Sequence, residues 1–149
     1  MKIMIDADGC PVVDNTVRLA KSYGVQVIIV CDTAHEFRGR GAQVITVDKG
    51  ADSADLRLVN LLEKGDIAVT QDHGLAALCL SKGARALDQN GMEYTLLNID
   101  SLLEMRYTSK KLRQSGKRMK GPKKRTIDND RAFEDALERI IKESLKTEG

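Results

Sequence analysis

Apolar residues along this chain follow two alternating patterns, and glycines separate many of the segments. Short runs that are apolar almost throughout are typical of strands covered on both faces, and they occur at residues 2–5, 25–31, 44–47, 66–70 and 85–87. Between these runs, apolar positions recur at helical spacing over residues 11–23, 53–64 and 75–82. Gly24, Gly65 and Gly83 follow these segments, where helices commonly end.

Strands that alternate with helices imply right-handed crossovers and a parallel sheet. The pattern therefore predicts an α/β fold with three layers, α/β/α, built around five parallel strands. In the helix predicted over residues 53–64, we expect Leu56, Val59, Leu62 and Leu58 to face inward.

The pattern changes after Asn90 and Gly91. A short helix is predicted over residues 99–106, followed by a basic loop over about 106–127 that glycine and proline interrupt. A final amphipathic helix is predicted over about residues 128–146, and we expect it to pack on the sheet without a part in any chemistry. We interpret residues 1–149 as one domain, a usual size for a single core. The inward face of the last helix is predicted to consist of Phe133, Ala136, Leu137, Ile140 and Ile141.

The formal net charge of +2 conceals a strong asymmetry between the body and the predicted loop. Residues 105–127 hold ten lysines and arginines and no acid, so the rest of the chain is acidic. A basic arm on an acidic body favours a polyanionic partner, although like-charged segments also occur as solvated linkers.

The composition narrows the class of protein further. Apolar residues make up 42% of the chain, but no apolar stretch approaches the ~20 residues of a membrane span. No cleavable leader is recognisable, so we expect a cytoplasmic protein without a membrane partner. The three cysteines are widely spaced, which favours neither a disulfide framework nor a zinc site. Cys31 and Cys79 are predicted to be buried, and Cys10 remains a candidate nucleophile that lacks an obvious base.

Acidic residues follow every predicted strand. Parallel strands all end at the same edge of the sheet, where ligands bind in such folds. Two more acids, Asp52 and Asp55, are three residues apart at the start of a predicted helix, near its positive end. The strand-end acids are Asp6 and Asp8, Asp32, Asp48, Asp72 and Asp88.

Carboxylates gathered at one edge would form an oxygen-ligand site for Mg²⁺ or Mn²⁺. Each acid also has a local explanation, as a turn residue, a helix cap or a first-turn acid. The histidines, His35 and His73, both lie at predicted strand ends, and His73, which follows Asp72 directly, could bind a metal or a substrate.

Metal-bound carboxylates beside basic groups suit phosphodiester hydrolysis, because cations activate water and basic side chains hold phosphates. Arg38 and Arg40 lie on the predicted loop after the second strand, at the same edge, although a plain surface loop would also carry them. The predicted nucleic-acid-binding residues are Arg38, Arg40, Lys111, Arg113, Lys117 and Arg118.

The segment Val69-Thr70-Gln71-Asp72, followed by Leu75-Ala76, resembles the fourth-strand motif of PIN-like nuclease domains. The whole chain resembles the uncharacterised bacterial YaiI/YqxD family, which has a PIN-like fold. The segments that carry this resemblance are Asp6 to Pro11, Lys49 to Asp55, Gly65 to Asp72, and Ser115 to Arg118 with Gly121 to Lys123.

The resemblance implies a metal-dependent site of the RNase type. Its catalytic residues would be Asp6, Asp8, Asp55 and Asp72, which would hold Mg²⁺ or Mn²⁺ with Asp52 in support, and RNA is the expected partner. A non-catalytic nucleic-acid-binding or adaptor protein is the alternative. Asp6-Ala7-Asp8 also resembles the acid pair of haloacid dehalogenase phosphatases, but Cys10 stands where that family has Thr or Val.

Overall fold

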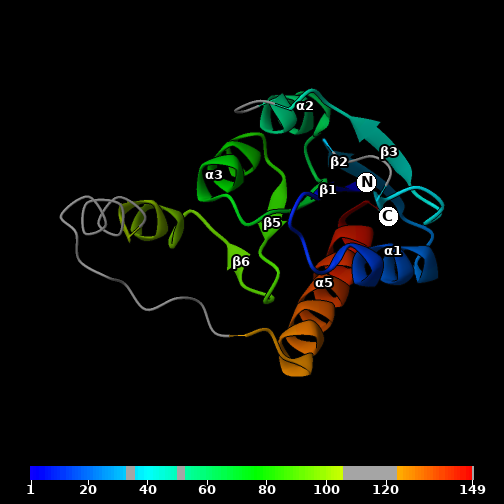
Figure 1. Ribbon diagram of the computed structural model, residues 1–149. Helices are drawn as coiled ribbons and strands as arrows, with labels where there is room; N and C mark the ends of the chain where they lie inside the picture. Colours follow the sequence, from blue (N-terminus) through cyan, green and yellow to red (C-terminus); the bar gives the residue numbers. More distant parts are fainter. Residues whose placement is uncertain (33–35, 50–52, 106–123, 149) are drawn as a thin grey trace.

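A six-stranded sheet lies between two layers of helices in the structure, a computed structural model that describes residues 1–32, 36–49, 53–105 and 124–148 (Figure 1). The strand order is β3-β2-β1-β4-β5-β6. A further helical segment begins at residue 99 and continues to residue 105, the end of that described range. The strands are β1 (Lys2–Asp6), β2 (Gln26–Cys31), β3 (Gln43–Thr46), β4 (Ile67–Val69), β5 (Arg85–Leu87) and β6 (Glu93–Tyr94), and the helices are α1 (Val13–Ser22), α2 (Ser53–Leu61), α3 (His73–Ser81) and α5 (Ile127–Glu148).

The predicted three-layer α/β/α fold is confirmed, but the predicted number of strands is wrong. The five parallel strands are present, and β6 adds a sixth that pairs antiparallel with β5. Only Glu93 and Tyr94 form β6, which is too short to produce a recognisable apolar pattern. Its existence depends on the turn after β5, which brings Tyr94 opposite Ala86.

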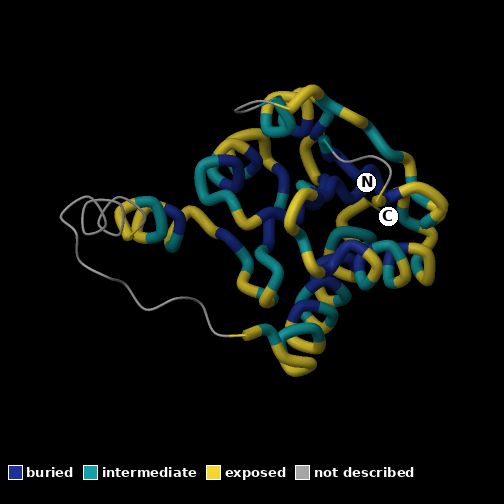
Figure 2. The backbone as a smooth tube through the Cα atoms, viewed as in Figure 1, coloured by how far each residue is buried: buried dark blue, intermediate teal, exposed yellow. Residues whose placement is uncertain are grey.

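The sheet has a separate apolar core on each face. Along β1, Ile3 and Ile5 belong to the core that includes residues of α1 and α5, while Met4 belongs to the core that includes residues of α2 and α3. Figure 2 shows the buried positions concentrated in the central strands, with exposed positions on the outer sides of the helices. This alternation is the two-residue period expected of a strand covered on both faces.

The last helix packs on the sheet as predicted. It begins at Ile127, within the predicted basic loop, and ends at Glu148. Its start is fastened by Arg125, whose guanidinium pairs with Asp130 and donates to Asn90 and to the carbonyl of Gln89. The remaining basic segment, residues 106–123, lies outside the described residues. The side chains of Phe133, Leu137, Ile140 and Ile141 are buried, whereas Ala136 is partly buried.

The predicted inward face of α2 is partly wrong. Leu58 and Leu62 are buried, but Leu56 is 63% exposed. Leu62 follows the end of α2 one turn after Leu58, and Val59 is partly buried against the same core, so the inward side of the helix excludes Leu56. Cys31 and Cys79 are buried as predicted. Within the described ranges, no helix is both long and apolar enough to cross a membrane.

The sheet changes direction of winding between β1 and β4. The chain moves from β1 outward to β2 and β3, and then returns to β4 on the other side of β1. In open α/β sheets, ligands bind in the crevice beyond the strand ends at this kind of switch point. A ligand-binding site is therefore expected at the residues that follow β1 and β4.

Candidate acidic site at the switch point

The hydroxyl of Thr70 connects the ends of β1 and β4. Its Oγ1 donates to Oδ2 of Asp6 at 2.9 Å and accepts from the backbone N–H of Asp72 at 3.0 Å. Thr70 is only 1% exposed, and its carbonyl accepts from the hydroxyl of Tyr94 at 3.1 Å. The two aspartates are thus held by one buried residue that the sequence prediction assigned no role.

Asp6 is a half-buried carboxylate without a cationic partner among the described residues. Burial raises its pKa above the usual range, and the neighbouring charges of Asp72 and Asp8 raise it further. The hydrogen bond from Thr70 acts in the opposite direction by favouring the charged form. A bound cation would stabilise the charged form of Asp6, which burial and the two acidic neighbours disfavour.

Asp72 caps α3 and also borders a pocket. Its Oδ1 accepts from the backbone N–H of Leu75 at 3.1 Å, which is the usual role of an N-cap aspartate. The same residue lines an open pocket of about 320 Å³ together with Asp6, Gln71 and His73. One carboxylate from each side of the switch point therefore faces a common space.

Asp8 and Asp55 lie near this pair but have different surroundings. Asp8 is exposed, and its Oδ2 accepts from the backbone N–H of Asp32 at 2.7 Å, which ties the end of β1 to the end of β2. Asp55 is in the first turn of α2. Burial raises the pKa of the Cys79 thiol to about 12, and the charges of Asp55 and Asp6 add to this effect. Four of the predicted acids, the pair Asp6 and Asp72 together with Asp8 and Asp55, therefore lie at the same edge of the sheet.

Other strand-end acids have local structural roles or lie elsewhere. Oδ1 of Asp88 accepts from the backbone N–H groups of Asn90 and Met92, so this residue shapes the turn before β6. Asp48 is exposed beside α2. Asp52 and His35, two further predictions, lie outside the described residues.

The oxygen donors fit a hard divalent cation, although the cluster is sparse. No group of three or more histidine, cysteine, aspartate or glutamate side chains that could hold a metal occurs in the part of the chain that the structure describes. Mg²⁺ is commonly held by one or two carboxylates, with waters and substrate phosphate oxygens as its other ligands. Asp6 and Asp72 would supply the two carboxylates. The described residues do not form a site in which every ligand comes from the protein.

His73 lies at the rim of the same pocket. Its Nδ1 is 3.3 Å from the carbonyl oxygen of Leu102, and its ring meets that of Tyr94 edge-on, with centroids 5.8 Å apart. Sequence reasoning named His73 but missed Tyr94 and Thr70. A threonine that ends an otherwise apolar strand was the available signal for Thr70, because a buried hydroxyl needs hydrogen-bond partners.

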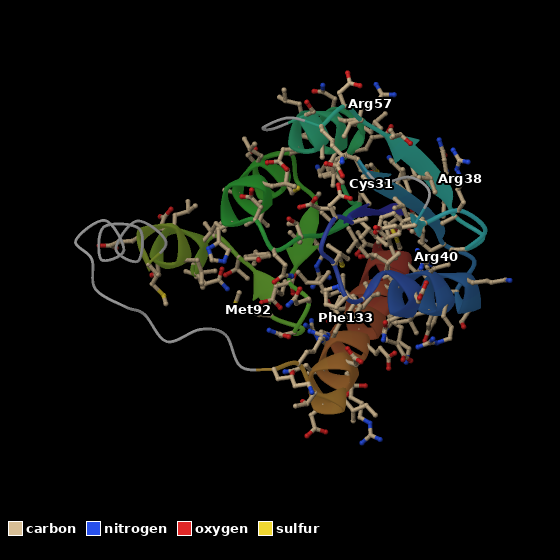
Figure 3. All side chains as sticks on the ribbon, viewed as in Figure 1. Cys31, Arg38, Arg40, Arg57, Met92 and Phe133 are labelled. Carbon is tan, nitrogen blue, oxygen red and sulfur yellow. The ribbon has the colours of Figure 1, made fainter. Side chains whose placement is uncertain are left out.

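The two arginines predicted for the loop after β2 differ in their contacts. Arg40 pairs with Asp14 at 2.7 Å, donates to the carbonyl of Glu36 and lies over the ring of Phe37. Arg38 is exposed and projects outward, as Figure 3 shows. Arg38 is therefore available to an anionic ligand, and Arg40 is occupied within the fold. The other predicted basic contacts lie outside the described residues: Lys111, Arg113, Lys117 and Arg118.

The alternative of Cys10 as a nucleophile gains no support from its surroundings. The thiol is half-buried, and burial raises its pKa, so it is protonated at neutral pH. An activated cysteine needs the opposite shift.

Replacing Asp6 by asparagine should stabilise the metal-free protein at neutral pH. Asparagine can still accept the hydrogen bond from Thr70, but it carries no desolvated charge. Because the pKa of Asp6 is raised in the folded state, its contribution to stability is complete below the unfolded pKa and is lost as pH rises through the folded pKa. The gain in melting temperature should therefore be present at pH 7 and disappear in acid.

Thermal unfolding in a chelator, followed by circular dichroism across this pH range, measures the effect. Asp88→Asn is the matched control, because it alters a carboxylate that accepts two backbone N–H groups, and it should not raise the melting temperature. A fall in melting temperature for Asp6→Asn at pH 7 would show that Asp6 is a structural acid.

Comparison with known proteins identifies close relatives over almost the whole chain. Residues 4–143 match the family model described as "Uncharacterized BCR, YaiI/YqxD family". A UPF0178 protein of Exiguobacterium sibiricum is 52% identical over 143 residues, covering 96% of this chain and 98% of the relative. Another from Ruminiclostridium cellulolyticum is 49% identical, covering 95% and 93%, and one from Enterococcus faecalis is 43% identical, covering 97% and 100%. No solved structure matches the chain.

Proposed function

The chain belongs to the uncharacterised YaiI/YqxD family, and for this member we propose a Mg²⁺- or Mn²⁺-dependent nuclease that hydrolyses phosphodiesters in RNA. The observation that carries the proposal is the half-buried carboxylate of Asp6, which faces Asp72 across a pocket at the switch point and has two acidic neighbours. The similarity of residues 69–76 to PIN-like nucleases supports the same interpretation, and the PIN-like relationship itself stays a prediction.

Asp6 and Asp72 would hold the cation, directly or through water, with Asp8 and Asp55 in the surrounding acidic field. A divalent cation bound there supplies charge neutralisation of the phosphate and an activated water. Thr70 keeps the Asp6 carboxylate oriented, because its hydroxyl is fixed by the backbone N–H of Asp72. Asp52 and the basic residues between 106 and 123 belong to the proposal from their sequence positions alone.

The pocket also has features that suit a phosphate. The first turn of α3 begins at His73, so the positive end of this helix borders the space that the two carboxylates face. Arg38, exposed on the loop after β2, would contact the substrate backbone farther along the same edge. These groups attract the polyanion, while the acidic pair would bind the cation.

The test is cleavage of a fluorescent single-stranded RNA with Mn²⁺, with Mg²⁺ and with chelator. We expect cleavage that requires the cation and that falls to the chelator background in Asp6→Asn. The fold is retained in that variant, because asparagine keeps the acceptor for Thr70.

Asp135→Asn is a suitable control, since this exposed carboxylate is on α5, the helix on the opposite face of the sheet from α2, and is outside the acidic pocket. Its cleavage rate should equal that of the wild type. Cleavage that survives Asp6→Asn would contradict the proposed mechanism. RNA binding without any cation-dependent cleavage would instead favour the non-catalytic binding protein.

A further inference from the structure

The described arginines divide by whether a carboxylate pairs with them. Five form ion pairs, and three form none with any carboxylate in the described ranges: Arg38, Arg57 and Arg131. An exposed guanidinium without an internal acid keeps its planar set of donors for a phosphate. Two of these three, Arg38 and Arg57, come from the segments directly before and after β3, and Figure 3 shows both projecting away from the ribbon.

Arg57 borders an open groove of about 450 Å³ between the end of β3 and α2. This volume is in the usual range for small-ligand sites, while the open shape suits a chain that passes over the surface. The groove is lined in part by Thr46, Asp48, Ser53, Leu56, Arg57 and Asn60.

The side chains of the groove match the parts of a nucleotide. Arg57 offers a fork for the phosphate, and the hydroxyl and amide groups offer partners for ribose and base edges. Leu56 is 63% exposed here, so it presents an aliphatic surface on which a base can lie. Asp48 also lines the groove, where its carboxylate offers an acceptor for a ribose hydroxyl or a base amino group.

The groove is on the same edge of the sheet as the acidic pocket. The strands β1, β3 and β4 all run parallel within one sheet, so their carboxyl ends share that edge. Helix α2 contributes to both places, because Asp55 in its first turn acts on the Cys79 thiol together with Asp6, and Arg57 borders the groove. A single strand that leaves the pocket toward β3 therefore meets this groove.

We propose that the groove between β3 and α2 binds one nucleotide of single-stranded RNA that extends from the acidic pocket, with Arg57 on its phosphate. The inference rests on the proposed nuclease function and specifies where its substrate runs.

The experiment measures binding rather than cleavage, with a fluorescein-labelled oligoadenylate in chelator. Arg57→Ala should weaken binding about fivefold to tenfold at low salt and reduce the slope of log affinity against log salt by about 0.7, the value for one phosphate contact on a single strand. Arg57→Lys should lie between this variant and the wild type, because lysine keeps the charge but not the fork.

Arg131→Ala is the matched control. Arg131 is also an exposed, unpaired arginine, but it is on α5, the helix that packs on the opposite face of the sheet from α2. Its loss removes the same net charge and should change affinity less than about twofold. Equal losses for Arg57→Ala and Arg131→Ala, or no binding of the oligoadenylate by the wild type, would overturn the groove proposal. A selective loss at Arg57 in a protein that cleaves no RNA would support the groove and contradict only the nuclease.

Discussion

Replacing Gly91 by alanine should destabilise the folded protein by about 3 kcal/mol or more. Gly91 has a φ of +88° in the turn between β5 and β6, and a Cβ there would lie 2.8 Å from the carbonyl carbon of Ala132 in α5. Backbone atoms of a packed helix cannot move aside as a flexible side chain can, so α5 or the turn must shift. Urea unfolding of wild type and Gly91→Ala measures the change.

Gly41→Ala separates this close approach from ordinary backbone strain. Gly41 has a φ of +76°, and a Cβ there would meet no atom within 4 Å. Gly41→Ala should therefore be destabilised by only about 1 kcal/mol, the cost of placing alanine in a left-handed conformation. A similar loss of stability in the two variants would show that the turn does not pack closely against α5 at Gly91.

Thr70→Val should destabilise the protein by about 2–4 kcal/mol at pH 7, since valine matches the shape of threonine but removes both hydrogen bonds. Asp6 loses a donor, and the backbone N–H of Asp72 loses its acceptor. The pKa of Asp6 should rise further, because the hydrogen bond from Thr70 opposes the effect of burial. The stability gap from wild type should therefore narrow as pH falls through the raised pKa of the variant.

Thr70→Ser is the corresponding control, because serine keeps the hydroxyl and gives up one buried methyl group. We expect it to cost about 1 kcal/mol and to retain the pH dependence of the wild type. Denaturant titrations at neutral and acid pH compare the three proteins. If valine and serine were equally tolerated, the hydroxyl would not be what holds Asp6 and Asp72 in place.

Much of the fold could be predicted, because parallel strands buried on both faces produce uninterrupted apolar runs. Residues 25–31 and 66–70 indicated β2 and β4, and the spacing of Phe133, Leu137 and Ile140 indicated the buried face of α5. Strand β6 could not be predicted in the same way, since two residues contain no period. The inward position predicted for Leu56 was wrong because the burial of α2 depends on which neighbours cover it.

The candidate site was only partly readable from the sequence. The positions of Asp6 and Asp72 after strands predicted that they share an edge, and the structure brings them to one pocket. The sequence could not separate them from Asp88, which also follows a strand but accepts hydrogen bonds within its own turn. That distinction depends on where each carboxylate oxygen finds a donor.

By itself, the sequence determined the α/β class, the family and the set of acids at the strand ends, because these follow from local periodicity, residue order and similarity. Only the tertiary structure decided which acids meet, since the strand order places β1 beside β4 although 60 residues separate Asp6 from Ile67. It also decided the environment of Asp6. Burial, a threonine hydroxyl and neighbouring charges act through space, and they make this aspartate differ from the other acids that follow a strand.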